Sequence, residues 1–235
     1  MKKLSIIIPC YNEAETIGEL LRRVEQVSFN GWEKEIIVVD DGSTDATPRI
    51  LRQYKDQIRT ILQKENKGKG SAVRRGLDAA TGSHAIIQDA DLEYDPREIT
   101  MLINALDRGE GDVIFGSRNL RDKERKGFLI PRMGVWFITK LLNALHGTKL
   151  TDAWTCYKLF PLAAAGDFRA GGFEAELLFT AALARRGVLL DEHAVTVEDR
   201  RRDHRLERRQ LGVRIHQQVA RDVLHVDAVL FPRPL

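Results

Sequence analysis

The sequence predicts an α/β fold built on one mostly parallel, doubly wound β-sheet. Two observations predict it: short, β-branched apolar segments recur along the chain, and segments with helical spacing of apolar residues separate them. Strands that alternate with helices in this way form parallel sheets covered by helices on both faces. Such sheets bind their ligands at the carboxyl ends of their strands, so we expect the functional residues in the loops that follow the strands.

Five segments carry the strand signal in the first half of the chain. Each is apolar over nearly its whole length, as expected of a strand that is buried on both faces of the sheet. The five segments are residues 4–9, 35–40, 59–63, 84–89 and 112–117. We expect one more strand near the carboxyl end of the pattern, at residues 187–197.

Helix start signals follow several of these strands. Asn12 is expected to cap a helix whose buried stripe consists of Ile17, Leu20, Leu21 and Val24. Thr47 followed by Pro48, and Asp95 followed by Pro96, repeat the pattern of a capping residue before a proline. These signals predict a helix after each of three strands.

The pattern changes beyond residue 120, where a charged loop precedes a strongly apolar helix at residues 131–146. Further helices are predicted at residues 173–186 and 213–226. Between the last two helices lies an arginine-rich segment, residues 200–209, with six arginines.

Composition excludes several classes of protein. Hydrophobic residues make up 43% of the chain and charged residues 30%, which excludes collagen-like and wholly disordered proteins. Cys10 and Cys156 have neither metal-ligand spacing nor the density of a disulfide framework, so a reducing compartment is expected. No apolar run approaches the roughly 20 residues of a membrane-spanning helix, and the amino-terminal run lacks the features of a signal peptide. We therefore expect a cytoplasmic protein.

An acidic turn follows the strand at residues 35–40. The segment from Asp40 to Asp45 contains three carboxylates and a glycine. Carboxylates at this edge accept hydrogen bonds from ribose hydroxyls or from a nucleobase N–H group. The alternative is that Asp41 and Ser43 only shape a turn and that Asp45 caps a helix.

A second acidic motif, Asp89-Ala90-Asp91, ends the strand at residues 84–89. The period of two along an extended chain predicts that both carboxylates lie on one face, with Glu93 beside them. Oxygen ligands of this kind favour Mg²⁺ or Mn²⁺. The alternative is coincidence, because a D-x-D pattern is common by chance.

Basic residues follow other strands. Arg118 comes directly after the strand at residues 112–117, and its guanidinium is suited to phosphate oxygens; the alternative is a surface arginine that begins a basic loop. Lys67, Lys69 and Arg74 lie in a glycine-containing segment without the G-x-x-x-x-G-K-[ST] spacing, so we reject a phosphate-binding loop there. They are expected in a loop and helix start near the same site.

Five motifs, PCYNE, VVDDGSTD, QDADLE, GSR and TDAWTCYK, occur in an order that resembles family 2 glycosyltransferases of the dolichyl-phosphate mannose synthase type. The resemblance spans about residues 4–198. It implies a GT-A fold, a nucleotide-diphosphate sugar donor of the GDP-mannose or UDP-glucose type, Mg²⁺ or Mn²⁺, and a dolichyl or undecaprenyl phosphate acceptor. We expect one catalytic domain at residues 1–210, with a nucleotide-sugar half (1–118) and an acceptor half (119–210), and a helix and tail at 211–235.

The resemblance also implies roles for individual residues. The nucleoside pocket is implied to be lined by Pro9, Tyr11, Glu13, Val39 and Asp41. The metal and diphosphate are implied to be held by Asp89, Ala90, Asp91 and Glu93, with Asp91 as a catalytic residue.

Arginines complete the set that the resemblance implies. Arg118 and Arg132 hold the phosphate of the acceptor or donor. Relatives carry an arginine and a G-E-S-K loop that closes over the donor, and Arg200 and Arg205 align with its basic positions, although this chain has RRRDHRL there. The alternative for this segment is a solvated arginine-rich loop. Residues 152–158 shape the sugar and acceptor pocket.

Two other functions remain open. A hydroxyl acceptor would require a carboxylate base, for which Glu174 and Glu176 are available, although acids at the start of a helix also favour its dipole. A non-catalytic nucleic-acid-binding protein would use the arginine cluster. We disfavour nucleic acid as a partner, because the acidic turns would repel a phosphate chain.

The apolar helix at residues 131–146 suggests how the protein meets a lipid. It could lie in a membrane interface with Arg132 and Lys140 near lipid phosphates and Trp136 at headgroup level; core packing or a dimer contact is the alternative. The chain ends in LFPRPL without a membrane-spanning helix, so we expect peripheral contact at the cytosolic membrane face. The oligomeric state stays open.

Overall fold

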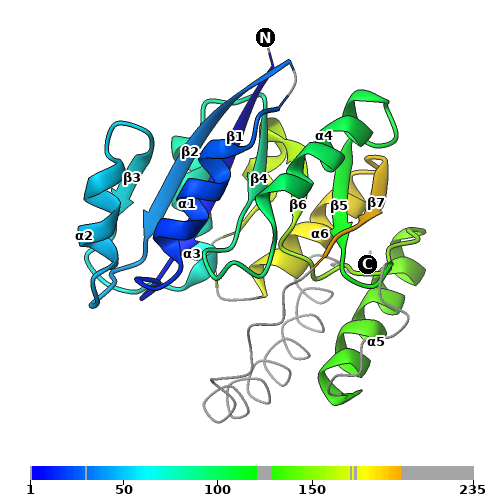
Figure 1. Ribbon diagram of the computed structural model, residues 1–235. Helices are drawn as coiled ribbons and strands as arrows, with labels where there is room; N and C mark the ends of the chain where they lie inside the picture. Colours follow the sequence, from blue (N-terminus) through cyan, green and yellow to red (C-terminus); the bar gives the residue numbers. More distant parts are fainter. Residues whose placement is uncertain (1, 30, 121–128, 170, 172–173, 197–235) are drawn as a thin grey trace.

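The protein is described by a computed structural model that covers residues 2–29, 31–120, 129–169, 171 and 174–196, with backbone alone at 129–135. These residues form a seven-stranded sheet with helices on both faces (Figure 1). The arginine-rich segment and the helix expected at 213–226 lie outside the described residues. In the part of the chain that is described, no helix has both the length and the apolar character needed to cross a membrane.

The sheet is mostly parallel, as predicted. Its strands are β1 (Lys2–Cys10), β2 (Trp32–Asp40), β3 (Arg59–Leu62), β4 (His84–Ile87), β5 (Val113–Ser117), β6 (Lys158–Pro161) and β7 (Leu190–Ala194), in the order β3-β2-β1-β4-β6-β5-β7. Only β6 runs antiparallel to its neighbours, β4 and β5. The sequence did not predict β6, because its four residues, KLFP, begin with a lysine and end with a proline and so give no apolar run.

Helices cover the sheet on both sides. They are α1 (Ile17–Gln26), α2 (Thr47–Leu51), α3 (Lys69–Ala79), α4 (Ile99–Asp107), α5 (Leu129–His146) and α6 (Ala175–Arg185), with 3₁₀ turns η1 (Arg52–Tyr54), η2 (Pro96–Glu98) and η3 (Leu162–Asp167). The cluster on one face contains side chains of α1 and α4, and the cluster on the other contains side chains of α3 and α6.

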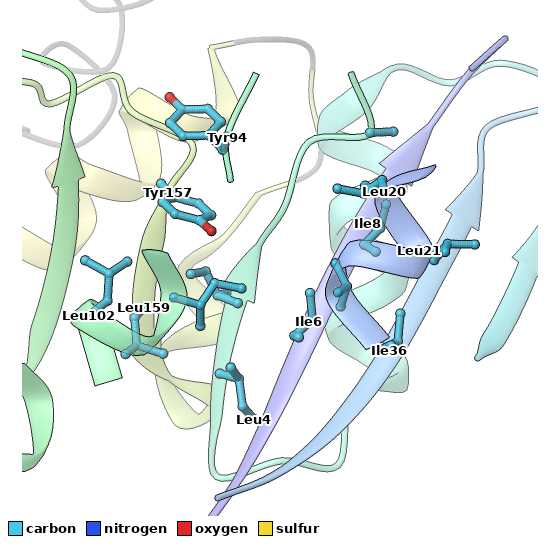
Figure 2. Close-up of a cluster of buried hydrophobic side chains, with 14 of the residues drawn as sticks. Leu4, Ile6, Ile8, Leu20, Leu21, Ile36, Tyr94, Leu102, Tyr157 and Leu159 are labelled. Atoms are coloured by element: carbon cyan, nitrogen blue, oxygen red, sulfur yellow. The ribbon is translucent and has the colours of Figure 1, made fainter. Parts of the chain in front are cut away.

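Alternation along the central strand supplies both halves of the core. Ile6 and Ile8 of β1 lie in the cluster with α1, whereas Ile7 between them lies in the cluster with α3. Figure 2 shows the first cluster, in which Tyr94 and Tyr157 stack with their ring centroids 4.8 Å apart. Because both faces of these strands are buried, the sequence of each strand is a continuous apolar run.

The predicted helix caps are partly wrong. The stripe of α1 is buried as predicted, but α1 begins at Ile17, after Thr16. Asn12 does not cap it: Asn12 has a φ of 55°, and its Oδ1 accepts a hydrogen bond from the Thr44 N–H at 2.8 Å. Because the Asn12 side chain already bonds to the loop that contains Thr44, it is not available to cap the helix that begins after Thr16.

The other two start signals differ in outcome. Asp95 caps η2 by accepting a hydrogen bond from the Arg97 N–H, as predicted. Thr47 lies inside α2 instead of before it, since Ala46 is at the cap position, and the Thr47 N–H donates to Asp45 Oδ1 at 2.9 Å. The hydroxyl of Thr47 instead accepts from the Glu13 N–H at 2.9 Å.

Candidate active site

The candidate site lies at the carboxyl edge of three adjacent strands, β1, β2 and β4. Cys10 at the end of β1 pairs in register with Asp40 at the end of β2. The N–H of Gln88, just beyond β4, donates to the carbonyl of Ile7 in β1. The loops that follow these three strands therefore start side by side, which brings the two acidic motifs to one edge.

The acidic turn after β2 is tied to the loop after β1. The Ser43 N–H donates to Asp40 Oδ1 at 2.9 Å, and the Ser43 hydroxyl accepts from the Asn12 N–H at 2.9 Å. Asp45 accepts a further hydrogen bond from the Ala14 N–H at 3.1 Å. Ser43 thus has the turn-shaping role that the sequence left open as the alternative, and Asp40 and Asp45 help to hold the same turn.

Asp41 has a different role, because its carboxylate holds the loop after β3. It is 3% exposed and accepts hydrogen bonds from Gln63 Nε2 at 2.8 Å, the Lys67 N–H at 2.9 Å and the Gly68 N–H at 2.8 Å. The turn brings Gly42 so close to this loop that a Cβ there would lie 2.7 Å from the carbonyl carbon of Glu65. Gly42 also has a φ of 75°, so both sterics and backbone geometry require glycine.

The structure places the five residues of the expected nucleoside pocket in different environments. Tyr11 is 43% exposed at this edge, and Glu13 is half-buried beside it. Pro9 is buried, and the Val39 side chain is fully buried in the cluster with α3. Tyr11, Glu13 and Asp41 therefore meet at the edge, whereas the Val39 side chain packs in the core.

The second acidic motif does not lie on a strand. β4 ends at Ile87, and Leu92 has a φ of 63°, so the chain turns instead of staying extended. The expected alternation of Asp89, Asp91 and Glu93 along one strand face is wrong. A turn follows β4 instead, in which the charges of Asp89 and Glu93 act on Asp91 and the Glu93 N–H donates to Asp91 Oδ1 at 3.0 Å.

Asp89 is paired with a cation that the sequence did not assign to it. Lys69, the first residue of α3, places its Nζ 2.5 Å from Asp89 Oδ1 and 2.9 Å from the Cys156 sulfur. Burial alone would raise the pKa of Asp89, but the charge and hydrogen bond of Lys69, together with the hydrogen bond from Cys156 and the charge of Arg118, outweigh burial and lower that pKa. Burial raises the pKa of the Cys156 thiol, which is therefore neutral.

Asp91 has no such partner. Among the described residues no lysine or arginine forms an ion pair with it, and burial, together with the charges of Asp89, Glu93 and Glu13, raises the pKa of Asp91 to about 7. Ala90 between the two aspartates is buried. A carboxylate without a lysine or arginine partner among the described residues suits a divalent cation, which oxygen ligands bind.

Arg118 is present at this edge but is held by a buried acid. Its Nε and Nη2 donate to the two oxygens of Asp152 at 2.6 and 2.8 Å, and the Asp152 side chain is fully buried. Arg118 also acts on Asp89. Burial would raise the pKa of Asp89, and the charge of Arg118 helps Lys69 to lower this pKa. Sequence reasoning placed Arg118 here but missed its pairing with Asp152, since only the fold brings these two loops together.

Glu176 is not exposed to an acceptor. It is 3% exposed, and its Oε2 lies 3.1 Å from Nζ of the fully buried Lys158. Lys158 also donates a hydrogen bond to the carbonyl of Thr155. Glu174 immediately precedes α6, and Glu176 lies in its first turn, as the helix-start reading of these acids expected.

Three predicted site residues cannot be placed by their side chains. Arg132 lies in α5, but its side chain falls outside the description. Arg200 and Arg205 lie outside the described residues altogether.

Known proteins resemble this chain in sequence over most of its length. The chain matches the model of Glycosyl transferase family 2 over residues 5–167. Dodecaprenyl-phosphate galacturonate synthase of Rhizobium johnstonii is 33% identical over 165 residues, which are 67% of this chain and 47% of that protein. Dolichol-phosphate mannosyltransferase of Pyrococcus furiosus is 38% identical over 121 residues, 51% of this chain and 34% of that protein. The matched part of the chain thus spans less than half the length of these two curated relatives.

A solved structure agrees with the fold. Glucosyl-3-phosphoglycerate synthase from Mycobacterium tuberculosis, in complex with Mn²⁺, uridine diphosphate and phosphoglyceric acid, superposes with a TM-score of 0.73 at 21% identity, over 95% of this chain and 78% of that one. This likeness shows the GT-A fold. Because the family model covers the chain from β1 to η3, with both acidic motifs inside it, the chain belongs to glycosyl transferase family 2.

Proposed function

We propose that this chain transfers a hexose from a nucleotide-diphosphate sugar to a polyprenyl phosphate, with inversion at the anomeric carbon and with a divalent metal ion. The observation that carries the proposal is the acidic cluster at the carboxyl edge of β1, β2 and β4, in which Asp91 has no counter-cation among the described residues. The names of both curated relatives contain a polyprenyl phosphate, which supports this class of acceptor.

The acidic cluster fits Mg²⁺ or Mn²⁺. Asp91 and Glu93 would hold the ion, with Asp89 beside them. When bound, the ion would neutralise the nucleoside diphosphate as it departs. The Mn²⁺ and uridine diphosphate in the similar M. tuberculosis structure support both a divalent ion and a nucleotide donor.

The donor nucleoside would lie across the loops after β1 and β2. Tyr11 is exposed there. Glu13 offers carboxylate oxygens to hydroxyl or base N–H groups, and Asp41 would hold the loop after β3 beside the nucleoside. Pro9 and Val39 are both buried, so they would pack beneath this surface. The donor type, GDP-mannose or UDP-glucose, is the first question for experiment.

A phosphate acceptor fits the charges of the site better than a hydroxyl acceptor. A phosphate is already an anion and needs positioning more than a general base. Arg118, held in place by Asp152, would attract it together with Arg132, and we propose that Arg200 and Arg205 close over the donor. Glu176, the base that a hydroxyl acceptor would need, is buried and ion-paired, which disfavours the saccharide alternative.

A donor panel tests the proposal. The full chain is incubated with Mn²⁺, dolichyl or undecaprenyl phosphate and each labelled nucleotide sugar, and label entering the organic phase is measured. We expect one donor to label the lipid and Asp91→Ala to abolish this with little loss of fold. The matched control is Asp56→Ala, because Asp56 is an exposed acid away from the site. Label on a saccharide acceptor alone would contradict the polyprenyl phosphate.

We further propose peripheral contact with the cytosolic membrane face through α5. Trp136 and Phe137 are 60% and 63% exposed, and Lys140 next to them is exposed as well. Large apolar side chains beside a cation suit an interface with anionic lipid.

A further inference from the structure

A group of metal-ligand side chains lies at the end of the sheet formed by β5 and β7. It consists of Glu110, in the loop before β5, and of Asp191 and His193 in β7, and their ligand atoms all lie within 4.8 Å of one another. In the described sheet, β7 is the last strand in the order, and β6 and β5 lie between it and β4. The group is therefore separate from the candidate active site at β1, β2 and β4.

The strand β7 supplies two of the three side chains. Asp191 and His193 are two residues apart in an extended strand, so both side chains lie on the same face of the sheet. Asp191 pairs in register with Ile114 of β5, and His193 pairs with Gly116. Both side chains are half-buried. The pairing with β5 thus fixes two neighbouring ligands on one surface.

A close approach of the preceding loop brings Glu110 to the same surface. A Cβ on Gly111, the next residue, would lie only 3.2 Å from the Cβ of Asp191. The Asp112 N–H donates to the carbonyl of Leu189 at 2.8 Å, which ties this loop to the start of β7. The third ligand is therefore positioned by backbone contacts between the two segments.

One imidazole nitrogen faces both carboxylates. His193 Nε2 lies 2.9 Å from Glu110 Oε2 and 3.1 Å from Asp191 Oδ2. Ionised carboxylates only accept hydrogen bonds, so a single N–H must serve two acceptors. A divalent cation in place of that proton would attract the imidazole nitrogen and both carboxylate oxygens at once.

The kinds of ligand and their spacing fit Zn²⁺. This ion binds histidine nitrogen and carboxylate oxygen at about 2.0–2.2 Å in tetrahedral sites, so two of its ligands lie roughly 3.3 Å apart. The separations of 2.9 and 3.1 Å at His193 are close to that value. Arg108 donates to both oxygens of Glu110, at 2.5 Å to Oε1 and 3.1 Å to Oε2. Hydrogen bonds of this kind orient a ligating carboxylate from outside a metal site.

We propose that Glu110, Asp191 and His193 form a Zn²⁺ site, with water as the fourth ligand, that joins β7 to the loop between α4 and β5. All five residues of β7 are only half-buried, so an ion that binds this strand to the loop would stabilise the end of the sheet. The inference goes beyond the proposed function and does not depend on it, because the ion of the proposed reaction is bound by other residues.

A binding measurement with Zn²⁺ alone tests the site. The parent protein is the full chain with Asp91→Ala, so that the acidic motif after β4 does not contribute, and Zn²⁺ affinity is measured by isothermal titration calorimetry. His193→Gln should weaken Zn²⁺ binding at least about tenfold, because loss of a ligand costs no less than loss of a group behind a ligand. Glu110→Gln and Asp191→Asn should each weaken it by roughly tenfold or more as well.

Thermal unfolding gives a second measurement. Zn²⁺ should raise the unfolding midpoint of the parent, because an ion that binds only the folded chain stabilises it. The midpoint of Glu110→Gln should not rise with Zn²⁺. If the three side chains formed ion pairs alone, each variant would have a lower midpoint by the same amount with and without Zn²⁺, and the inference would be overturned.

His146→Gln is the matched control. His146 is a half-buried histidine at the end of α5, and in the described part of the chain it belongs to no group of three such ligands. This variant should keep the Zn²⁺ affinity of the parent. Equal affinities of the parent and His193→Gln, or no Zn²⁺ binding by the parent, would overturn the inference. Should His193→Gln fail to fold, Glu110→Gln decides in the same way, because it changes a loop residue outside the strand.

Discussion

Three aspartates at one sheet edge have three different electrostatic environments. Asp41 is compensated by three hydrogen-bond donors, and Asp89 is compensated by the ammonium of Lys69. Asp91 is compensated by neither a lysine nor an arginine among the described residues. At the scale of residues, the three carboxylates differ in function because they differ in their partners.

The raised pKa of Asp91 predicts a pH dependence of metal binding. Burial and the neighbouring charges of Asp89 and Glu93 raise the pKa of Asp91 to about 7, so below that pH a proton occupies the carboxylate and competes with the ion. Mn²⁺ affinity should fall about tenfold for each pH unit below the pKa and level off above it. Titration with Mn²⁺ one unit below and one unit above that pKa measures this. Equal affinities at the two pH values would contradict the assignment of Asp91.

A second carboxylate predicts a pH dependence of stability. Burial alone would raise the pKa of Glu35, but hydrogen bonds from Ser5 and Thr81 outweigh burial and lower it from 4.5. A lowered pKa stabilises the folded state above pH 4.5, and this stabilisation is lost as the pH falls through the lower folded-state pKa.

Glu35→Gln should therefore reduce the free energy of unfolding by about 1–3 kcal/mol near neutral pH. The difference from wild type should shrink in acid, since the glutamine does not titrate. Urea unfolding at neutral pH and well below pH 4.5 measures both values. A difference that stays constant across the two conditions would show that ionisation of Glu35 has no part in it.

At the scale of elements, the amino-terminal end of α3 is the most restricted contact near the site. Gly68 precedes the helix with a φ of 90°, and Gly70 in its first turn touches the backbone of Gly171, between η3 and α6. No side chain fits between these two segments. The close approach keeps Lys69 beside Asp89, so the packing of one helix end controls the charge balance of the site.

Gly70→Ala should separate these two segments. A methyl group would meet the carbonyl carbon of Gly171 at 2.8 Å, and overpacking against backbone costs about 1–3 kcal/mol. We expect a lower unfolding midpoint and reduced turnover. The matched control is Gly18→Ala in α1, where the nearest atom would lie at an ordinary 3.7 Å; alanine there should leave stability unchanged or raise it by up to about 1 kcal/mol. Equal effects of the two substitutions would refute the close-approach argument.

At the scale of the whole molecule, the sheet separates stability from chemistry. The apolar clusters on its two faces supply the core, and the polar groups gather at the carboxyl edge of β1, β2 and β4. The helix α5 (Figure 1) carries Trp136 and Phe137, whose side chains are exposed. The domain boundary expected at residue 210 lies outside the described residues and stays a prediction.

The exposure of Trp136 predicts a fluorescence response to lipid. Vesicles containing anionic lipid should shift tryptophan emission to the blue, because Trp136 is 60% exposed and would enter a less polar interface. Trp32 is 7% exposed and should not respond. Trp136→Phe is the control, since it keeps an aromatic ring and removes the reporter. A blue shift that persists in this variant would place the response elsewhere, and no shift in wild type would contradict membrane contact through α5.

Local sequence patterns were sufficient for six of the seven strands and for the acidic motifs that follow two of them. The runs in β1 and β2 are continuous in hydrophobicity because both faces of each strand are buried, and the motifs at Asp41 and Asp91 follow strands whose carboxyl ends share one edge. β6 was missed because a lysine and a proline leave it without an apolar run, and Asn12 was misassigned because its partner, Thr44, lies in a different loop.

The sequence by itself determined six of the seven strands and where acidic residues follow them, because period and composition act over a few neighbouring residues. Only the tertiary structure decided which acids are compensated. The pairs Lys69–Asp89, Arg118–Asp152 and Lys158–Glu176 each join segments that are separate in the chain. Ion pairing depends on distance in space, and distance in space is set by the packing of helices against the sheet.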